Sequence, residues 1–98
     1  MDEAKALMEE SEGYILLDVR TKEEYESGYI PGAINIPLSD INGNVVSSLP
    51  DKSRMILVYC RSGNRSRQAS DKLSRLGYTN IIEIGGINSW KGEIIKID

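Results

Sequence analysis

Apolar residues gather in short, nearly unbroken runs, and the segments between them carry polar residues with helical spacing. Runs without strict alternation are typical of parallel strands that helices cover on both faces. The predicted strands are residues 14–19, 33–36, 55–60 and 81–84. The predicted helices are residues 2–10, a short segment after the Thr21–Glu24 capping box, and a longer one after the loop that follows residue 60. Because strands and helices alternate, the pattern predicts an α/β sandwich with a mostly parallel sheet.

The run 55–60 ends at Cys60, the one cysteine of the chain, and a short polar loop follows it. The backbone N–H groups of such a loop can turn inward, and the next helix directs its positive N-terminus at the same point. Arg61 and Arg65 add full positive charges. Together these features favour a thiolate of lowered pKa, which is the nucleophilic form of cysteine. Such a site requires that the amides point at the sulfur and that the sulfur is open to solvent.

A structural role for Cys60 is the alternative, because a cysteine ending an apolar strand is often a small buried core residue. The surrounding loop argues against that role. It holds two arginines, serine, glycine and asparagine, none of which a core cysteine needs.

The chain has 98 residues, enough for one domain covering residues 1–98. Its net charge is −3, which disfavours a nucleic-acid partner, but basic residues predominate over 54–75 and favour a small anionic substrate. No histidine is present, so a Cys-His dyad is excluded and we expect neither a metal site nor a cofactor.

No apolar run approaches the roughly 20 residues that span a bilayer, so we expect no membrane contact. A lone cysteine cannot form an internal disulfide, and a free reactive thiol suits a reducing compartment. We therefore expect a cytoplasmic protein.

Four other residues are candidates for a role at or near the site. Asp18, near the end of its strand, is either a site residue or, as we favour, a tether that accepts backbone N–H bonds. Gly85 and Gly86 would allow the backbone to approach the Cys60 loop closely. Trp90 is interpreted as an anchor in the core or at its rim.

Four segments, taken in order, resemble the signatures of single-domain rhodaneses over nearly the whole chain. They are Leu17–Arg20 with Glu24 and Tyr25, then residues 28–37, residues 60–66, and residues 77–90. The resemblance implies a rhodanese-like three-layer sandwich whose sheet has about five strands.

The resemblance also implies sulfur transfer through a cysteine persulfide, with Cys60 as the catalytic residue. The donor would be an anion such as thiosulfate, and the acceptor cyanide, a thiol or a sulfur-relay protein. Arg61 and Arg65 would hold the donor, and the alternative role for Arg65 is a brace within the loop. Residues expected to supply amides and loop geometry are Ser62, Gly63, Asn64 and Ser66, the last also as a helix cap. With no second cysteine, the sulfur must leave to an external acceptor.

Two features of the chain, one residue and one strand, depart from the family pattern. Tyr29 stands where histidine is usual, a change we expect to affect packing and not catalysis. The strand that commonly precedes the first helix is missing, truncated or replaced by the tail Glu93–Ile97, which is a candidate edge strand.

Two other functions compete with sulfur transfer. Rhodanese-related phosphatases and arsenate reductases also use a loop thiolate, but the phosphatases have a longer loop than the four residues between Cys60 and Arg65. A non-catalytic binding module is the other alternative, and the retained cysteine and arginines disfavour it. A persulfide carrier between two proteins stays open.

Overall fold

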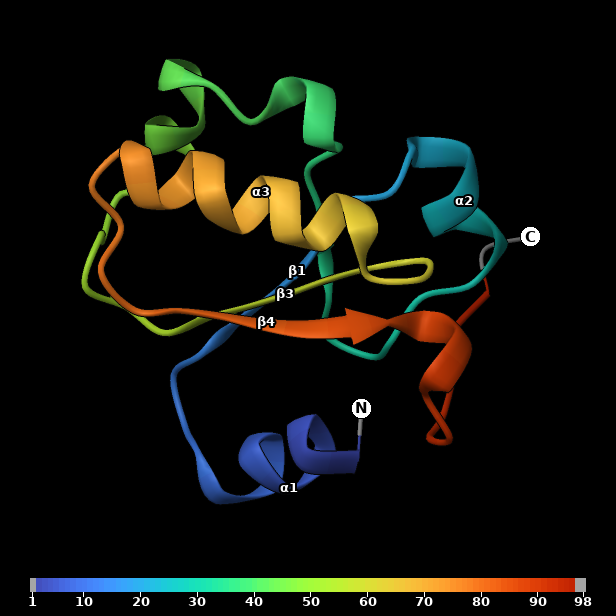
Figure 1. Ribbon diagram of the computed structural model, residues 1–98. Coiled ribbons are helices and arrows are strands. Elements are labelled where there is room, and N and C mark those ends of the chain that lie inside the picture. Colours follow the sequence, from blue (N-terminus) through green and yellow to red (C-terminus); the bar gives the residue numbers. More distant parts are fainter. Residues whose placement is uncertain (1, 97–98) are drawn as a thin grey trace.

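Four parallel strands form the sheet of this computed structural model, which describes residues 2–96 (Figure 1). The spatial order is β2-β1-β3-β4, so β3 is central, as its apolar sequence predicts. The strands are β1 Ile15–Asp18, β2 Ile34–Asn35, β3 Ile56–Cys60 and β4 Ile81–Gly86. The α-helices are α1 Asp2–Glu10, α2 Lys22–Ser27 and α3 Asn64–Arg75, and the short 3₁₀ helices are η1 Leu38–Asp40, η2 Gly43–Ser47 and η3 Ile87–Ser89.

The predicted α/β sandwich is confirmed, but the sheet has four strands within residues 2–96 and not about five. The tail is not an edge strand over the described residues. Ile95 forms only an isolated antiparallel bridge with Tyr29, which lies in the sequence between α2 and β2 and belongs to none of the four strands. Ile97, the last residue of the expected strand, lies outside the described residues.

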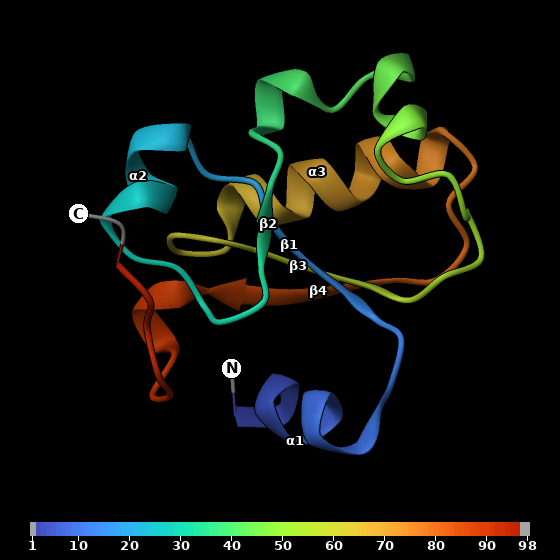
Figure 2. The same ribbon diagram turned by 180° about the vertical axis from the view of Figure 1, so that it is seen from behind.

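Alternation along β3 divides the core into two apolar clusters, one on each face of the sheet. Ile56, Val58 and Cys60 belong to the cluster under α3, with Ala69, Leu73 and the η1–η2 segment. Leu57 and Tyr59 belong to the cluster on the opposite face, where α1 packs (Figures 1 and 2). The Cys60 side chain therefore points to the α3 face. None of the helices in residues 2–96 is long and apolar enough to cross a membrane.

Local sequence signals set the ends of the two helices nearest the loop. The capping box at α2 is confirmed, since Thr21 Oγ1 accepts from the Glu24 amide at 3.3 Å and Glu24 Oε1 accepts from the Thr21 amide at 3.2 Å. Gly63 begins α3 as its N-cap, with a left-handed φ of 107° that a side chain would strain. This turn brings the chain from β3 into α3 within three residues.

Strand β4 continues through Gly85 and Gly86, two residues beyond the expected end, and passes directly under the Cys60 loop. A Cβ at Gly86 would overlap the carbonyl oxygen of Arg61 and lie 2.5 Å from the Cα of Ser62. The predicted close approach of backbone to loop is confirmed at this residue.

We predict that Gly86→Ala destabilises the protein by about 1–3 kcal/mol, because rigid backbone atoms must move to admit the methyl group. Urea unfolding measures the loss. Gly43→Ala is the matched control, since a Cβ there meets no atom within 4 Å. Equal stability of the two variants would contradict the close approach.

Candidate active site

Cys60 ends β3 with its sulfur beneath the first turn of α3. The amide of Gly63 donates to Cys60 Sγ at 3.0 Å, and the hydroxyl oxygen of Ser66 lies 3.5 Å from the same sulfur. The N-terminus of α3, which carries partial positive charge, also begins at Gly63. The first requirement of the predicted site, an amide aimed at the sulfur, is therefore met.

Two opposing effects set the pKa of the Cys60 thiol. Burial raises it, whereas the Ser66 hydroxyl and the amides of Ser66, Gly63 and Ser62 lower it by hydrogen bonding to the thiolate. The hydrogen bonds prevail, and the pKa lies below the ordinary value for cysteine. The loop thus favours the nucleophilic form of the sulfur.

The second requirement, a sulfur open to solvent, is not met by the resting thiol, because Cys60 is only 1% exposed. The alternation of β3 places its side chain in the apolar cluster under α3. Around it Arg61, Ser62 and Asn64 are exposed. A donor approaching from the loop side meets these three residues first.

Helix α3 begins earlier than the sequence suggested. Asn64, Arg65 and Ser66 all lie in its first turn. Ser66 is therefore not a cap: it lies inside the helix, and its Oγ lies 2.9 Å from the carbonyl oxygen of Gly63. The early start has a physical cause in the left-handed turn at Gly63, which ends the loop after three residues.

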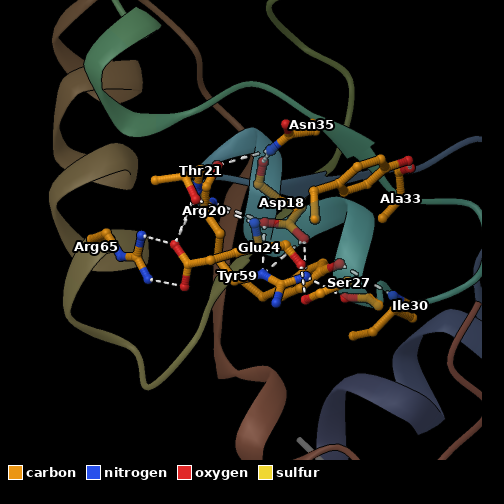
Figure 3. A network of polar contacts seen from close by, with 12 residues as sticks. Asp18, Arg20, Thr21, Glu24, Ser27, Ile30, Ala33, Asn35, Tyr59 and Arg65 are labelled. Atoms are coloured by element: carbon orange, nitrogen blue, oxygen red, sulfur yellow. Dashed lines mark hydrogen bonds and ion pairs between the residues drawn. The ribbon is translucent and has the colours of Figure 1, made fainter. Parts of the chain in front are cut away.

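Arg65 points to α2 and forms a two-point ion pair with Glu24 (Figure 3). Its Nη1 and Nη2 atoms donate to the two Glu24 carboxylate oxygens at 2.6 and 2.9 Å. These bonds are the main reason that the pKa of Glu24 falls to about 2, with further help from Thr21 and against the effect of burial. Of the two roles considered for Arg65, this geometry favours the brace.

Arg61 is exposed to solvent, whereas Arg65 is half-buried and paired with Glu24. The Arg61 side chain is exposed at the outer side of the loop, and its backbone carbonyl accepts from the amide of Asn88 at 3.2 Å. The carbonyl bond fixes the loop to η3, and the charged side chain stays available to an anion from solvent.

Asp18 accepts a backbone N–H bond, as the favoured interpretation predicted, and it also forms an ion pair with Arg20 that was not predicted. It is fully buried and accepts the Arg20 amide at 2.8 Å and the Arg20 guanidinium at 2.7–3.1 Å (Figure 3). Arg20 also donates to the carbonyl of Gly28 at 2.6 Å and lies 5.8 Å from the ring centre of Tyr59. This network fixes the segment that leads from β1 into α2, the helix from which Glu24 reaches Arg65.

Tyr29 and Trp90 are the two aromatic residues for which the sequence predicts a packing role. Tyr29 stacks on Tyr25 with ring centres 4.2 Å apart, consistent with a structural role where the family usually has histidine. Trp90 is half-buried at the rim of the cluster on the α1 face, and its ring nitrogen donates to the carbonyl of Glu93 at 3.0 Å.

Sequence reasoning missed two acidic residues at the site. The sequence places Glu24 in the capping box and in the first family signature but does not reveal its pairing with Arg65. Glu83 was not singled out, yet its Oε1 accepts from the Ser66 hydroxyl at 2.5 Å. It is the only charged residue in an otherwise apolar strand, which is a signal that could have marked it.

Over residues 2–96 no three histidine, cysteine or acidic side chains come together as a metal site would need.

We predict that Glu24→Gln lowers the free energy of unfolding at pH 7 by about 1 kcal/mol, because the charged partner of Arg65 is lost. The pKa of Glu24 is lower in the folded protein than its ordinary value of 4.5. Its stabilising effect is therefore complete above about pH 4.5 and is lost as the pH falls through about 2.

Chemical denaturation as a function of pH checks this: the wild type and Glu24→Gln should differ at pH 7 and converge toward pH 2. Glu23→Gln, an exposed carboxylate in the same helical turn, is the matched control. A difference that persists unchanged at pH 2 would contradict the assignment of the effect to the ion pair.

Comparisons with known proteins agree with this geometry. Residues 1–93 match the family model described as Rhodanese-like domain. Thiosulfate sulfurtransferase PspE of Escherichia coli is 41% identical over 71 residues, which are 72% of this chain and 68% of that protein. The adenylyltransferase and sulfurtransferase UBA4 of Meyerozyma guilliermondii is 39% identical over 89 residues, but the chain spans only 21% of its length.

Solved structures give the same result. A rhodanese with anions from E. coli has a TM-score of 0.78 at 36% identity, covering 85% of this chain and 98% of that one. The Alr3790 protein from Anabaena has a TM-score of 0.86 at 31% identity, covering 98% and 89%. The sequence match, the fold and the cysteine loop agree, and the chain belongs to the rhodanese-like domain family.

Proposed function

We propose that the protein is a sulfurtransferase that moves a sulfane sulfur from an anionic donor such as thiosulfate to a thiophilic acceptor through a persulfide on Cys60. The observation that carries the proposal is the Gly63 amide directed at Cys60 Sγ at 3.0 Å, at the start of α3. The similarity to the thiosulfate sulfurtransferase of E. coli supports the reaction class.

The first half-reaction loads the sulfur. The Cys60 thiolate attacks the outer sulfur of thiosulfate, a new S–S bond forms, and the sulfur–sulfur bond of the donor breaks. Sulfite leaves with the electron pair of the broken bond. Arg61, exposed beside the loop, would attract the donor and bind its oxygens.

The loop would stabilise the anions on both sides of this step. The amides of Ser62, Gly63 and Ser66 lower the pKa of the thiol, against the effect of burial, and the same donors are placed to stabilise a persulfide anion. Asn64 contributes to the turn from which α3 begins. Arg65 would act by bracing this turn against Glu24 rather than by holding the donor.

The second half-reaction unloads the sulfur. An acceptor attacks the outer sulfur of the persulfide, the S–S bond to Cys60 breaks, and the thiolate is restored. Cyanide would become thiocyanate, and a thiolate would become a persulfide. Because the chain has one cysteine, no internal thiol can compete for this sulfur, and the acceptor must be another molecule.

A persulfide carrier in a sulfur relay is the second candidate. It is supported by relatives named adenylyltransferase and sulfurtransferase, of which this chain matches about a fifth. The nearly complete burial of Cys60 also supports it, since a partner protein could open the loop as it docks.

We further propose that residues 1–98 form one rhodanese-like domain. The cytoplasmic location of the protein stays a prediction from the sequence.

We predict that incubation with thiosulfate adds one sulfur atom to the protein, and that Cys60→Ser abolishes the addition. Mass spectrometry of the intact chain measures it, and cyanide should remove the added sulfur as thiocyanate. The Cys60→Ser variant should keep its circular dichroism spectrum, which separates loss of chemistry from loss of fold.

An unmodified mass after exposure to thiosulfate and to other sulfane donors would contradict both transfer and carriage and would favour a non-catalytic binding module. Loading without thiocyanate production would favour the carrier. Hydrolysis of an aryl phosphate without any sulfur loading would instead support the phosphatase alternative.

A further inference from the structure

The hydroxyl of Ser66 lies between the nucleophile and a carboxylate. Ser66 is fully buried, and its Oγ is 3.5 Å from Cys60 Sγ and 2.5 Å from Glu83 Oε1. It also lies 2.9 Å from the carbonyl of Gly63. A hydroxyl has one proton and can donate it to only one of these acceptors at a time. The direction of the Ser66–Cys60 hydrogen bond therefore depends on which acceptor takes the proton.

Glu83 is the strongest competitor for that proton. Hydrogen bonds from a hydroxyl to a carboxylate are short, about 2.5–2.7 Å, and roughly twice as strong as neutral ones. The 2.5 Å contact with Glu83 is the shortest that Ser66 makes with any of these groups. While Ser66 donates to Glu83, only the lone pairs of its oxygen face Cys60, and these can accept from S–H but cannot stabilise S⁻.

We infer that Glu83 is a positioning residue that acts through Ser66 to keep the resting sulfur of Cys60 more protonated than the loop alone would. The inference rests on the proposed function, in which Cys60 is the nucleophile. The orientation of the hydroxyl and the negative charge of Glu83 act in the same direction, because both oppose formation of the thiolate.

The other charged groups around Cys60 differ from Glu83 in being cationic, paired or exposed. The loop presents Arg61, and α3 presents Arg65, whose charge is paired with Glu24 of α2. At the end of β1, Asp18 is paired with Arg20. The η1 segment contributes Leu38 to the cluster around Cys60, and its Asp40 is exposed. Glu83 is thus the group on β4 that opposes the amides and the arginines.

This arrangement would place the negative charge differently in the resting enzyme and in the enzyme that carries a persulfide. In the resting state the charge of the thiolate resides on Sγ, beside Ser66, where Glu83 opposes it. Once sulfur has been loaded, the charge moves to the outer sulfur, and the Ser66–Sγ contact no longer bears it. The free thiol is thereby less prone to attack by oxidants, which react with thiolates.

The test is a titration of the Cys60 thiolate by its ultraviolet absorbance, with Cys60→Ser as the blank for the tyrosines. We expect Glu83→Gln to lower the midpoint by about one unit, equal to roughly tenfold more thiolate at a fixed pH below it. In a Ser66→Ala background the same substitution should lower the midpoint by less than half as much. Glu9→Gln, an exposed carboxylate in α1 on the other face of the sheet, should leave it unchanged.

Glu83→Leu supplies a second variant, since it removes both the charge and the acceptor and suits an apolar strand; it should lower the midpoint at least as far. An unchanged or raised midpoint in Glu83→Gln would overturn the inference, as would an equal shift with and without the Ser66 hydroxyl. The titration does not depend on turnover, so these outcomes are distinct from a failure to load sulfur, which would overturn the proposed function.

Discussion

The left-handed turn at Gly63 is the constraint on which the rest of the site depends. It lets the chain leave β3, reverse within three residues and enter α3, so that one backbone amide and the positive end of a helix face the same sulfur. Burial alone would raise the thiol pKa, because a charge is disfavoured in an apolar cluster. Hydrogen bonds from the loop amides, and from the Ser66 hydroxyl when its proton faces the sulfur, reverse that effect. A nucleophile can thus be kept inside the core of a protein that has no histidine to activate it.

Contacts with neighbouring elements hold the Cys60 loop in place; its shortness alone does not. Strand β4 passes beneath it at Gly86, η3 holds the Arg61 carbonyl, and Arg65 reaches to Glu24 on α2. Helix α2 is in turn fixed by its capping box and by the buried Asp18–Arg20 pair (Figure 3). Elements far apart in the sequence therefore determine where the short loop directs its amides, and a change in α2 can alter the chemistry at Cys60.

Local patterns in the sequence were enough to predict the layers, the central position of β3, the capping box and the cysteine loop. They could not predict the two carboxylates at the site, because Glu24 meets Arg65 across 41 positions and Glu83 meets Ser66 across 17. Such contacts follow from strand order, which periodicity does not reveal. The expectation that the Cys60 sulfur is open to solvent was wrong, since α3 covers this face of the sheet. The tail failed as a strand because it meets Tyr29 and not a sheet edge.

The central claim is that hydrogen bonds from the loop outweigh burial and lower the pKa of the Cys60 thiol below its ordinary value. A pH titration of thiolate absorbance in the wild-type protein tests it most directly, because the only cysteine in the sequence is the only source of the signal once the tyrosines are subtracted. A midpoint below the value of about 8.5 for free cysteine is predicted. A midpoint at or above that value would show that burial prevails, and would contradict the account.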